Sequence, residues 1–368
     1  MLKKTIRRLG ALAMVLAMAV SVFAVNASAV TSIPGLVNGD TMTITKNVTA
    51  AENVYAPVTS FNFTVATARS GEFDGNVVYA GVDNGVYFVD NKNSIDFDAS
   101  MVKNTAGNYT GTTQLKVDIK KFTAPGVYHY TVSETKDSYD GITYDTAARD
   151  LYVYITNGSS GLEVSNVVLG KWVKKSANDK IETVFVKDDS WTNVYNGVYT
   201  LTVTKAVTGL QGDKNKDFKF TVSVAGVVGE KYKVEYKTKE SDTNWTVATL
   251  DSSNTTTTGA TKSLEINLKD TGIIKIYGLS ATDTYTISEE NYSTDGYTTS
   301  YKVGTANAVS ANTATDAMGN ADTSIVYTNN KEGNTPTGVI MTIAPYALMV
   351  VVAGAFAVVF LSRRNRAE

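Results

Sequence analysis

A duplicated strand motif with a lysine near its centre constrains most strongly what this chain can fold into. The segments TMTITKNV (41–48) and TLTVTKAV (200–207) are near-copies, and each opens a long series of strand-like runs. Side chains alternate between the two faces of a strand, so Lys46 and Lys205 each share a face with the apolar side chains of their segment. Both lysines are therefore expected inside apolar cores.

Two further polar residues follow each lysine in the same order. The motif YTVSE (130–134) returns as YTISE (285–289), and WTN (191–193) returns as YTN (327–329). The same alternation places Glu134, Asn193, Glu289 and Asn329 on apolar faces. A repeated order with loops of different length indicates two copies of one domain.

Neighbouring residues offer one-residue alternatives in the second copy. Glu290 follows Glu289, and Asn330 follows Asn329. Both alternatives fall on the opposite strand face, so the alternation disfavours them.

The composition favours an all-β chain. Thr, Val and Tyr are frequent, only five residues are proline, and short alternating runs recur. We expect two tandem immunoglobulin-like β-sandwich domains, 30–196 and 197–333. The junction at Asn196-Gly197 joins the last strand of one domain almost directly to the first strand of the next, which predicts an end-to-end rod.

Both ends of the chain carry export and anchoring signals. Residues 1–29 have four basic residues, an apolar run over 9–25 and the small-residue site Ala27-Ser28-Ala29, which predicts a cleaved signal peptide more strongly than a retained membrane anchor. An uncharged run over 339–361 is long enough to cross a bilayer, and the basic tail 362–368 predicts a cytoplasmic end. Between Gly333 and this run lies Asn-Thr-Pro-Thr-Gly (334–338).

Charge and residue usage exclude several functions. The formal net charge is −2; removing the four positive charges of 1–29 and the net two beyond Thr337 leaves −8 for 30–337. An acidic exported surface argues against a nucleic-acid partner. The chain has no cysteine and one histidine, His129, which alternation places opposite the core-facing Tyr128 and Tyr130. We therefore expect a surface histidine, no metal or other cofactor, and no conventional enzyme active site.

Each predicted core would bury an amine, a carboxyl and an amide. Burial of unpaired charges is costly, so the three groups must compensate one another. One possibility is a salt bridge whose hydrogen bonds the asparagine completes. The other is chemical: burial lowers the pKa of a lysine and raises that of a glutamate, so a neutral amine can attack the amide and release ammonia. The product would be a Lys–Asn isopeptide bond.

Longer motifs resemble a known family. The runs that carry the likeness are GVYHYTVSE (126–134), GITYDTAARDLYVYI (141–155), LTVTKAVTG (201–209), DFKF (217–220), TISEENY (286–292), GYTT (296–299) and VYTNNK (326–331). The chain resembles the major (backbone) pilins of Gram-positive sortase-assembled pili, of the streptococcal type with two pilin isopeptide-linkage domains. The resemblance implies CnaB-type domains in which Lys46 joins Asn193 under Glu134, and Lys205 joins Asn329 under Glu289.

The same resemblance gives the C-terminal motif a role. Asn-Thr-Pro-Thr-Gly is similar to the Leu-Pro-x-Thr-Gly sorting signals, which a sortase cleaves between Thr and Gly, here Thr337 and Gly338. A surface lysine of the next subunit would receive the Thr337 carbonyl. Lys187 in VFVKDDSW is the first candidate and Lys180 the second, ahead of Lys171, Lys174 and Lys175.

The implied partners are a pilin-type sortase, other copies of the chain in a covalent homopolymer, peptidoglycan, accessory pilins and host surface ligands. The implied location is the cell wall or surface pilus of a Gram-positive bacterium. A singly wall-anchored adhesin or stalk protein is the alternative, although only about fifteen residues precede Lys46 in the mature chain, which leaves no room for a separate binding domain.

Overall fold

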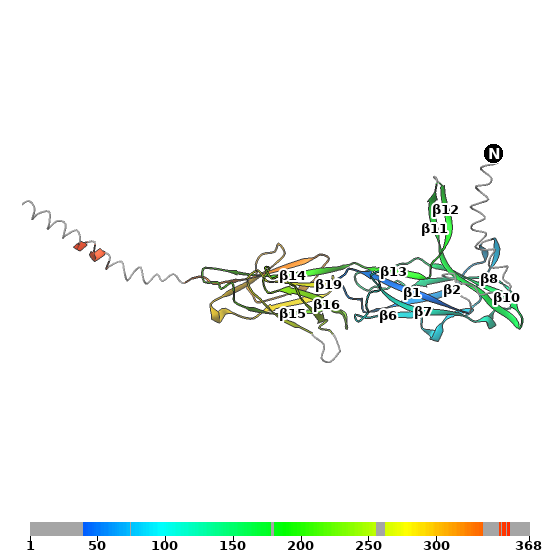
Figure 1. Cartoon of the computed structure of the whole chain (residues 1–368), viewed down its shortest axis with the longest axis horizontal. Helices are drawn as coiled ribbons and strands as arrows, with labels where there is room; N and C mark the ends of the chain where they lie inside the picture. Colours follow the sequence, from blue (N-terminus) through cyan, green and yellow to red (C-terminus); the bar gives the residue numbers. More distant parts are fainter. Residues whose placement is uncertain are drawn as a thin grey trace, which may run out of the picture.

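The computed structural model describes residues 40–73, 75–177, 180–254, 262–333, 346, 348–350 and 352–353. The described residues up to 333 form two β-sandwiches arranged end to end in an elongated rod (Figure 1). The expectation of an all-β chain with two sandwiches is confirmed. The predicted signal peptide and the motif 334–338 lie outside the described residues, as does most of 339–361. In the described part of the chain, no helix is both long and apolar enough to cross a membrane.

The N-terminal sandwich packs a five-stranded sheet, β5-β7-β1-β13-β9, against a larger sheet, β12-β11-β10-β8-β2-β6, to which β4 and β3 attach beside β8. Its elements are β1 (Thr41–Ala50), β2 (Thr59–Thr67), β3 (Gly71–Phe73), β4 (Asn76–Ala80), β5 (Val86–Phe88), η1 (Val89–Asn91), β6 (Ser94–Phe97), β7 (Asn108–Val117), η2 (Ile119–Lys121), β8 (Gly126–Glu134), β9 (Ile142–Thr143), β10 (Arg149–Gly158), β11 (Gly161–Ala177), β12 (Lys180–Lys187) and β13 (Ser190–Tyr195).

The C-terminal sandwich packs a six-stranded sheet, β17-β16-β19-β14-β23-β21, against a four-stranded sheet, β18-β15-β20-β22. Its elements are β14 (Val198–Thr208), β15 (Phe218–Ala225), β16 (Lys231–Lys237), β17 (Thr246–Asp251), β18 (Leu264–Leu268), β19 (Ile273–Ser280), β20 (Thr284–Glu289), η3 (Ser293–Asp295), β21 (Thr298–Val303), β22 (Thr313–Ala317) and β23 (Thr323–Asn330).

The first and last strands of each sandwich lie side by side. β1 pairs with β13 in parallel, and β14 pairs with β23 in the same way. Val48 stands opposite Asn193 in the first pair, and Val207 stands opposite Asn329 in the second. Each lysine therefore lies two residues before the position opposite its asparagine, on the same sheet face.

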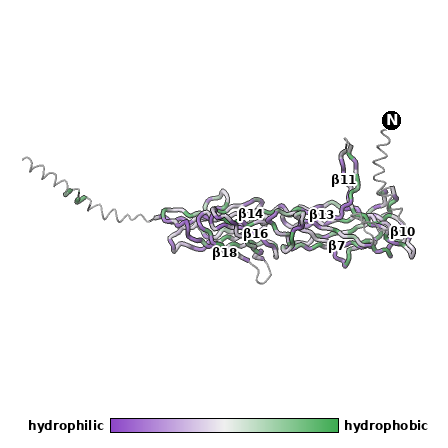
Figure 2. Tube along the Cα trace, viewed as in Figure 1, coloured by the Kyte–Doolittle hydropathy of each residue, from purple (hydrophilic) through white to green (hydrophobic). Residues whose placement is uncertain are grey.

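Strict alternation builds both cores. In β1 the residues Met42, Ile44, Lys46 and Val48 are all buried, while the intervening threonines are at least partly exposed. Figure 2 shows this change between hydrophobic and hydrophilic residues along both sandwiches. Because side chains of a strand point alternately to the core and to solvent, the lysine of the repeat is carried inward with its apolar neighbours.

The junction between the sandwiches is short. β13 ends at Tyr195 and β14 begins at Val198. The backbone N–H groups of Asn196 and Gly197 both donate to the Gly141 carbonyl, at 3.1 and 2.9 Å. A Cβ atom on Gly197 would lie 2.6 Å from the Gly141 Cα, so this close approach requires glycine.

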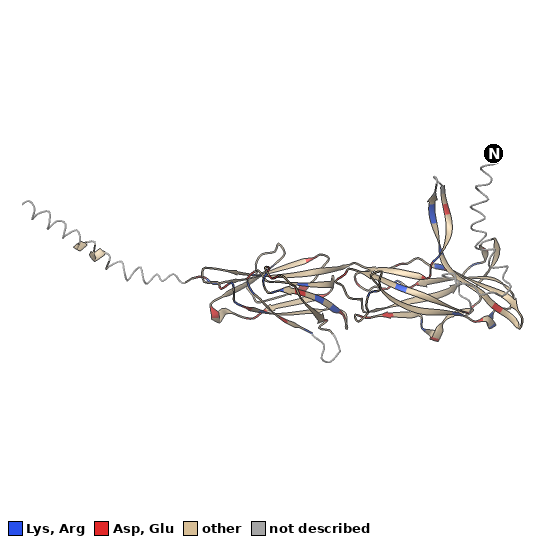
Figure 3. Cartoon of the chain, viewed as in Figure 1, with Lys and Arg blue, Asp and Glu red and all other residues tan. Residues whose placement is uncertain are grey.

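One hairpin stands away from the rod. β11 and β12 continue beyond the edge of the larger N-terminal sheet and project from it (Figure 1). Both signs of charge are scattered along the two sandwiches (Figure 3).

Candidate functional sites

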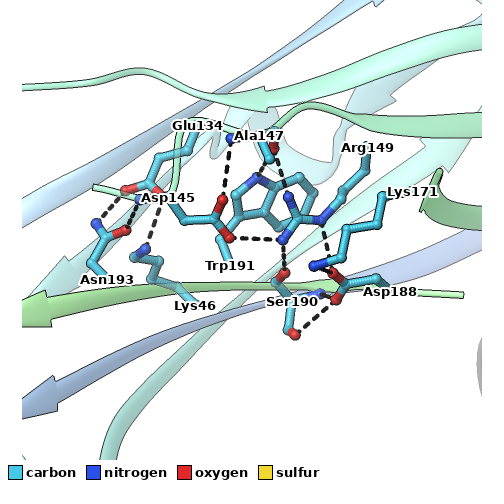
Figure 4. Close-up of polar contacts among 10 residues, drawn as sticks. All are labelled: Lys46, Glu134, Asp145, Ala147, Arg149, Lys171, Asp188, Ser190, Trp191 and Asn193. Atoms are coloured by element: carbon cyan, nitrogen blue, oxygen red, sulfur yellow. Dashed lines mark hydrogen bonds and ion pairs between the residues drawn. The ribbon is translucent and has the colours of Figure 1, made fainter. Parts of the chain in front are cut away.

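The N-terminal core holds Lys46, Glu134 and Asn193 in direct contact (Figure 4). The Lys46 Nζ lies 2.8 Å from Oε2 of Glu134, and the Asn193 Nδ2 donates to Oε1 of Glu134 at 2.6 Å. Lys46 and Asn193 are fully inaccessible to solvent, and Glu134 is 6% exposed. A single carboxyl group thus bridges the amine and the amide nitrogen.

Burial shifts both ionisable groups of this site toward their neutral forms. Desolvation lowers the pKa of Lys46 to about 8, although the neighbouring Glu134 opposes the shift. Desolvation likewise raises the pKa of Glu134 above its ordinary value, against the opposing effect of Lys46. Proton transfer from the amine to the carboxyl therefore costs less here than in water. The result of that transfer is a neutral, nucleophilic lysine beside an amide.

The amide oxygen of Asn193 faces a different donor. It accepts a hydrogen bond of 2.7 Å from the backbone N–H of Asp145, which lies in the loop before β10. Because a backbone N–H can only donate, this contact identifies the oxygen side of the amide. The carboxyl of Glu134 therefore approaches the nitrogen of the amide.

The C-terminal core repeats the trio with looser hydrogen bonding. The Lys205 Nζ lies 3.3 Å from Oε1 of Glu289 and donates to the Ala206 carbonyl at 3.0 Å. Lys205 is 1% exposed, Glu289 2% and Asn329 0%. Neither side-chain polar atom of Asn329 has a hydrogen-bond partner among the described residues.

The ionisation pattern matches that of the first site. Burial lowers the pKa of Lys205 to about 8 and raises the pKa of Glu289. The fully buried Asn329 amide is close enough to lower the pKa of Glu289, although it forms no hydrogen bond of normal geometry.

The structure brings together all six residues of the two predicted trios. The alternatives in the second copy point elsewhere: Glu290 is exposed, and Asn330 is only partly buried and accepts a hydrogen bond from Thr208. Strand alternation therefore correctly predicted that Glu289 is buried rather than Glu290, and Asn329 rather than Asn330.

The sequence prediction missed a second buried group beside the first site. Arg149 is 1% exposed and pairs with Asp145 at 2.8 Å and with Asp188 at 3.0 Å. Its guanidinium also lies 4.6 Å from the centre of the Trp191 ring. The sequence did contain a signal for the burial of this residue. Arg149 lies on the same face of β10 as Leu151, Val153 and Ile155, which point into the core.

His129 lies on the outer face of its strand, as predicted, but it is only partly exposed. Its Nε2 lies 2.8 Å from Asp150, its Nδ1 lies 3.1 Å from the Arg69 carbonyl, and its ring stacks on Tyr152. These contacts hold it as a packed part of the sheet surface. Among the described residues, no group of three or more His, Asp or Glu side chains could hold a metal ion.

The lysines proposed as acceptors differ in their surroundings. Lys187 ends β12 with an exposed side chain, and partial desolvation lowers its pKa without any carboxylate close enough to oppose the shift in the described part of the chain. Lys171 is paired with Asp188 at 2.7 Å. Lys174 and Lys175 are exposed on β11, and Lys180 begins β12 with a side chain outside the described residues. Thr337 and Gly338 also lie outside them.

Comparison with known proteins gives two family matches, one for each sandwich. Residues 42–196 match the Spy0128-like isopeptide containing domain. Residues 199–331 match a domain of unknown function, DUF7601.

Streptococcal proteins are similar to this chain over most of its length. A protein named "Pilin" from Streptococcus pyogenes serotype M1 is 29% identical over 357 residues, which cover 93% of this chain and 96% of that protein. The crystal structure of the major pilin from Streptococcus pyogenes is 25% identical, with a TM-score of 0.58 over 81% of this chain and 100% of that one. A second S. pyogenes major pilin, T3.2, shares the fold at 22% identity and a TM-score of 0.55.

Proposed function

Because residues 42–196 belong to the Spy0128-like isopeptide containing domain family and the whole chain is similar to streptococcal pilins, we propose that this protein is the shaft subunit of a covalently polymerised cell-surface pilus. The observation that carries the proposal is the pair of buried Lys–Glu–Asn trios, in each of which the lysine and the asparagine lie on the first and last strands of a sandwich and the glutamate reaches them from the facing sheet. In this proposal 30–196 and 197–333 are the two domains of the mature subunit.

Each trio forms one isopeptide bond in a single intramolecular reaction. In the first, a proton passes from the Lys46 amine to Glu134, and the neutral Nζ attacks the Asn193 Cγ. The new Nζ–Cγ bond replaces the Cγ–Nδ2 bond. Glu134 returns the proton to the departing nitrogen, then takes the second proton from Nζ and ends protonated, so ammonia is the only product lost. Glu134 is well located for both transfers, since its two oxygens contact the two nitrogens. Lys205, Glu289 and Asn329 have the same roles in the second.

The bonds suit a load-bearing shaft. Each links adjacent parallel strands at the two ends of a domain sequence, so tension entering through β1 passes to β13 without loading the strands between them. The short junction passes the load to β14, and the second bond carries it to β23. The protein is thus structural, and its chemistry is a one-time maturation step.

Polymerisation uses the predicted sorting signal. A pilin-type sortase cleaves between Thr337 and Gly338 and transfers the Thr337 carbonyl to a lysine of the next subunit, or to peptidoglycan at the base of the fibre. Lys187 is the preferred acceptor, because its amine is exposed and its lowered pKa increases the neutral fraction. Lys171 is less suited, because its amine is engaged in an ion pair with Asp188.

Wall extraction followed by a denaturing gel tests the polymer. A ladder of high-mass species is expected, and it should collapse to a single species when Thr337 is replaced by Ala. One discrete band in the unmodified strain would instead support a singly anchored surface protein.

Mass spectrometry tests the internal bonds separately. The two-sandwich region should weigh less than its calculated mass by two molecules of ammonia, one for each bond. Full calculated mass in fresh, folded protein would refute the isopeptide chemistry, whatever the gel shows.

A further inference from the structure

We propose that the backbone N–H of Asp145 is the oxyanion donor for the reaction at Asn193, and that Arg149 is the positioning residue that holds this donor in place. This inference rests on the proposed function, because it concerns how the first isopeptide bond forms. It assigns a role to the group formed by Asp145 and the buried side chains of Arg149 and Trp191, which the Lys–Glu–Asn trio does not include.

Attack on an amide moves negative charge onto its oxygen, so a donor aimed at that oxygen lowers the barrier. Glu134 cannot fill this role in the observed geometry, because it accepts from the Asn193 Nδ2. The Asp145 N–H does point at the Asn193 Oδ1, at 2.7 Å, and Asn193 itself is fully inaccessible to solvent. The two groups therefore have different roles. The Glu134 carboxyl moves protons between the two nitrogens, and the Asp145 N–H stabilises the oxyanion.

The bonds and protons of the reaction balance when Glu134 and the Asp145 N–H have these roles. The Lys46 Nζ adds to the Asn193 Cγ, and the C=O electron pair moves to Oδ1, where the Asp145 N–H stabilises it. The pair then returns as the Cγ–Nδ2 bond breaks, and ammonia leaves with the proton from Glu134. The Glu134 carboxylate formed in this way takes the second proton from Nζ, which leaves a neutral amide. The backbone N–H keeps its own proton throughout, so no further reactant is needed.

The donor lies in a loop, and buried contacts hold that loop. The Asp145 carboxylate accepts from Nη2 of Arg149 at 2.8 Å, and this contact keeps the pKa of Asp145 below its ordinary value although burial raises it. Arg149 donates to the Ala147 carbonyl at 2.6 Å and to the Ser190 carbonyl at 2.7 Å. The Trp191 Nε1 also donates to the Ala147 carbonyl, at 3.1 Å.

Arg149 thereby ties the loop to the strand that carries Asn193. Its contacts reach Asp145 and Ala147 on one side, and Ser190 and Asp188 around the start of β13 on the other (Figure 4). The Asp145 carboxylate also has a backbone hydrogen bond with Thr192 in β13, so Arg149 supplies the charged one of its two links to that strand. Displacement of a reacting group by about 1 Å can slow a reaction on the order of 100-fold, so the tie matters for rate.

The second site provides an internal comparison. The Asn329 Oδ1 has no hydrogen-bond donor among the described residues, so no equivalent of the Asp145 N–H is present there. We therefore expect the Lys46–Asn193 bond to form faster than the Lys205–Asn329 bond in the same molecule.

The test follows both bonds in time in the full two-sandwich chain. After pulse synthesis in a cell-free system, samples are digested, and the two cross-linked peptides are quantified separately by mass spectrometry. Asp145→Pro removes the N–H and should slow the first bond by roughly 100- to 1,000-fold, the usual effect of deleting one oxyanion donor. Asp145→Ala keeps the N–H and should slow it much less. The second bond should keep its rate in both variants.

Arg149 is tested by graded replacement. Arg149→Met should slow the first bond by at least about tenfold, and Arg149→Lys, which keeps a charge for Asp145, should recover part of that rate. Each change is also made with Lys46→Met, which cannot form the bond, so that its effect on folding is measured alone. A purely structural role predicts that the rate loss disappears under conditions where these control variants are fully folded.

The outcomes distinguish a failure of the isopeptide function from a failure of the oxyanion assignment alone. If neither peptide is cross-linked in the unmodified chain, the isopeptide function itself fails. If both are cross-linked and Asp145→Pro and Arg149→Met leave the rate of the first bond unchanged while folded, only the oxyanion assignment is overturned.

Discussion

Tyr139 in the N-terminal sandwich donates its hydroxyl proton to Oε1 of Glu230 in the C-terminal sandwich. The other oxygen of Glu230 lies 2.9 Å from the Tyr232 hydroxyl, which also lies 3.1 Å from Oδ2 of Asp283. Glu230 and Asp283 are at most 5% exposed. One hydroxyl proton cannot serve two ionised carboxylates, so the geometry favours a proton on one of them. The junction between the two sandwiches therefore contains a buried pair of acidic side chains, Glu230 and Asp283.

The first prediction concerns the pH dependence of this junction. Burial, reinforced by Glu230 and the nearby Asp140, raises the pKa of Asp283 from 3.8 to about 7. The folded state then binds more protons than the unfolded state between these values, so stability falls as the pH rises from about 4 to about 7 and is level above. Asp283→Asn should remove this decline and stabilise the C-terminal sandwich at pH 8 by at most about 4 kcal/mol.

Guanidinium unfolding checks this, in a Lys205→Met, Glu289→Gln background that lacks the C-terminal bond. Thr282→Ala is the matched control, because it removes only the hydroxyl contact to Asp140 and should leave the slope with pH unchanged. Equal pH slopes for the parent and for Asp283→Asn would contradict the assignment.

The second prediction isolates the stability supplied by the first covalent bond. Lys46→Met with Glu134→Gln removes the nucleophile and both ionisable groups together, so no buried charge is left unpaired. The bond closes the loop 46–193, and its loss should destabilise the N-terminal sandwich by roughly 5 kcal/mol in the chain-entropy model. Glu134→Ala alone should cost more, since it also leaves the Lys46 amine buried without a partner. Thermal unfolding measures both, and a smaller loss for Glu134→Ala would count against the model.

Alternation along strands was sufficient to predict the two trios. Lys46 and Asn193 are far apart in sequence, yet each shows its inward direction through its own neighbours, and the repeat supplies the same pattern twice. Parity of this kind is local information, so it needs no knowledge of the tertiary fold. The same parity marks Arg149 as buried, but its partners could not be read from it.

The Asp145 N–H and the Tyr139–Glu230 contact lie beyond such reasoning. Asp145 occupies a loop, where no period of two defines a direction, and its donor is a backbone group that every residue possesses. Tyr139 meets Glu230 only because two separate sandwiches come together at Gly197. Contacts across loops and junctions depend on the three-dimensional path of the chain, which strand patterns do not contain.

The third prediction concerns the acceptor of the Thr337 carbonyl. Lys187→Arg keeps the positive charge but removes the primary amine, so the polymer ladder should be lost while both internal bonds still form. Lys171→Arg should leave the ladder intact, because Asp188 already holds that lysine in an ion pair. Tandem mass spectrometry of the purified polymer should identify a Thr337–Lys187 linkage. A ladder that persists in Lys187→Arg would move the acceptor to another lysine.

The fourth prediction is mechanical. When the chain is pulled from Asp40 and Gly333, the two bonds should keep 46–193 and 205–329 from extending. Lys46→Met with Glu134→Gln should release the first loop, adding one step with a contour length of about 52 nm, at about 3.5 Å for each of its 148 residues. Lys205→Met with Glu289→Gln should release the 125 residues of the second loop in a shorter step, of about 44 nm. Because the steps differ in size, single-molecule force spectroscopy identifies which sandwich has opened. A step of either size in the unmodified chain would show that the corresponding bond does not carry the load.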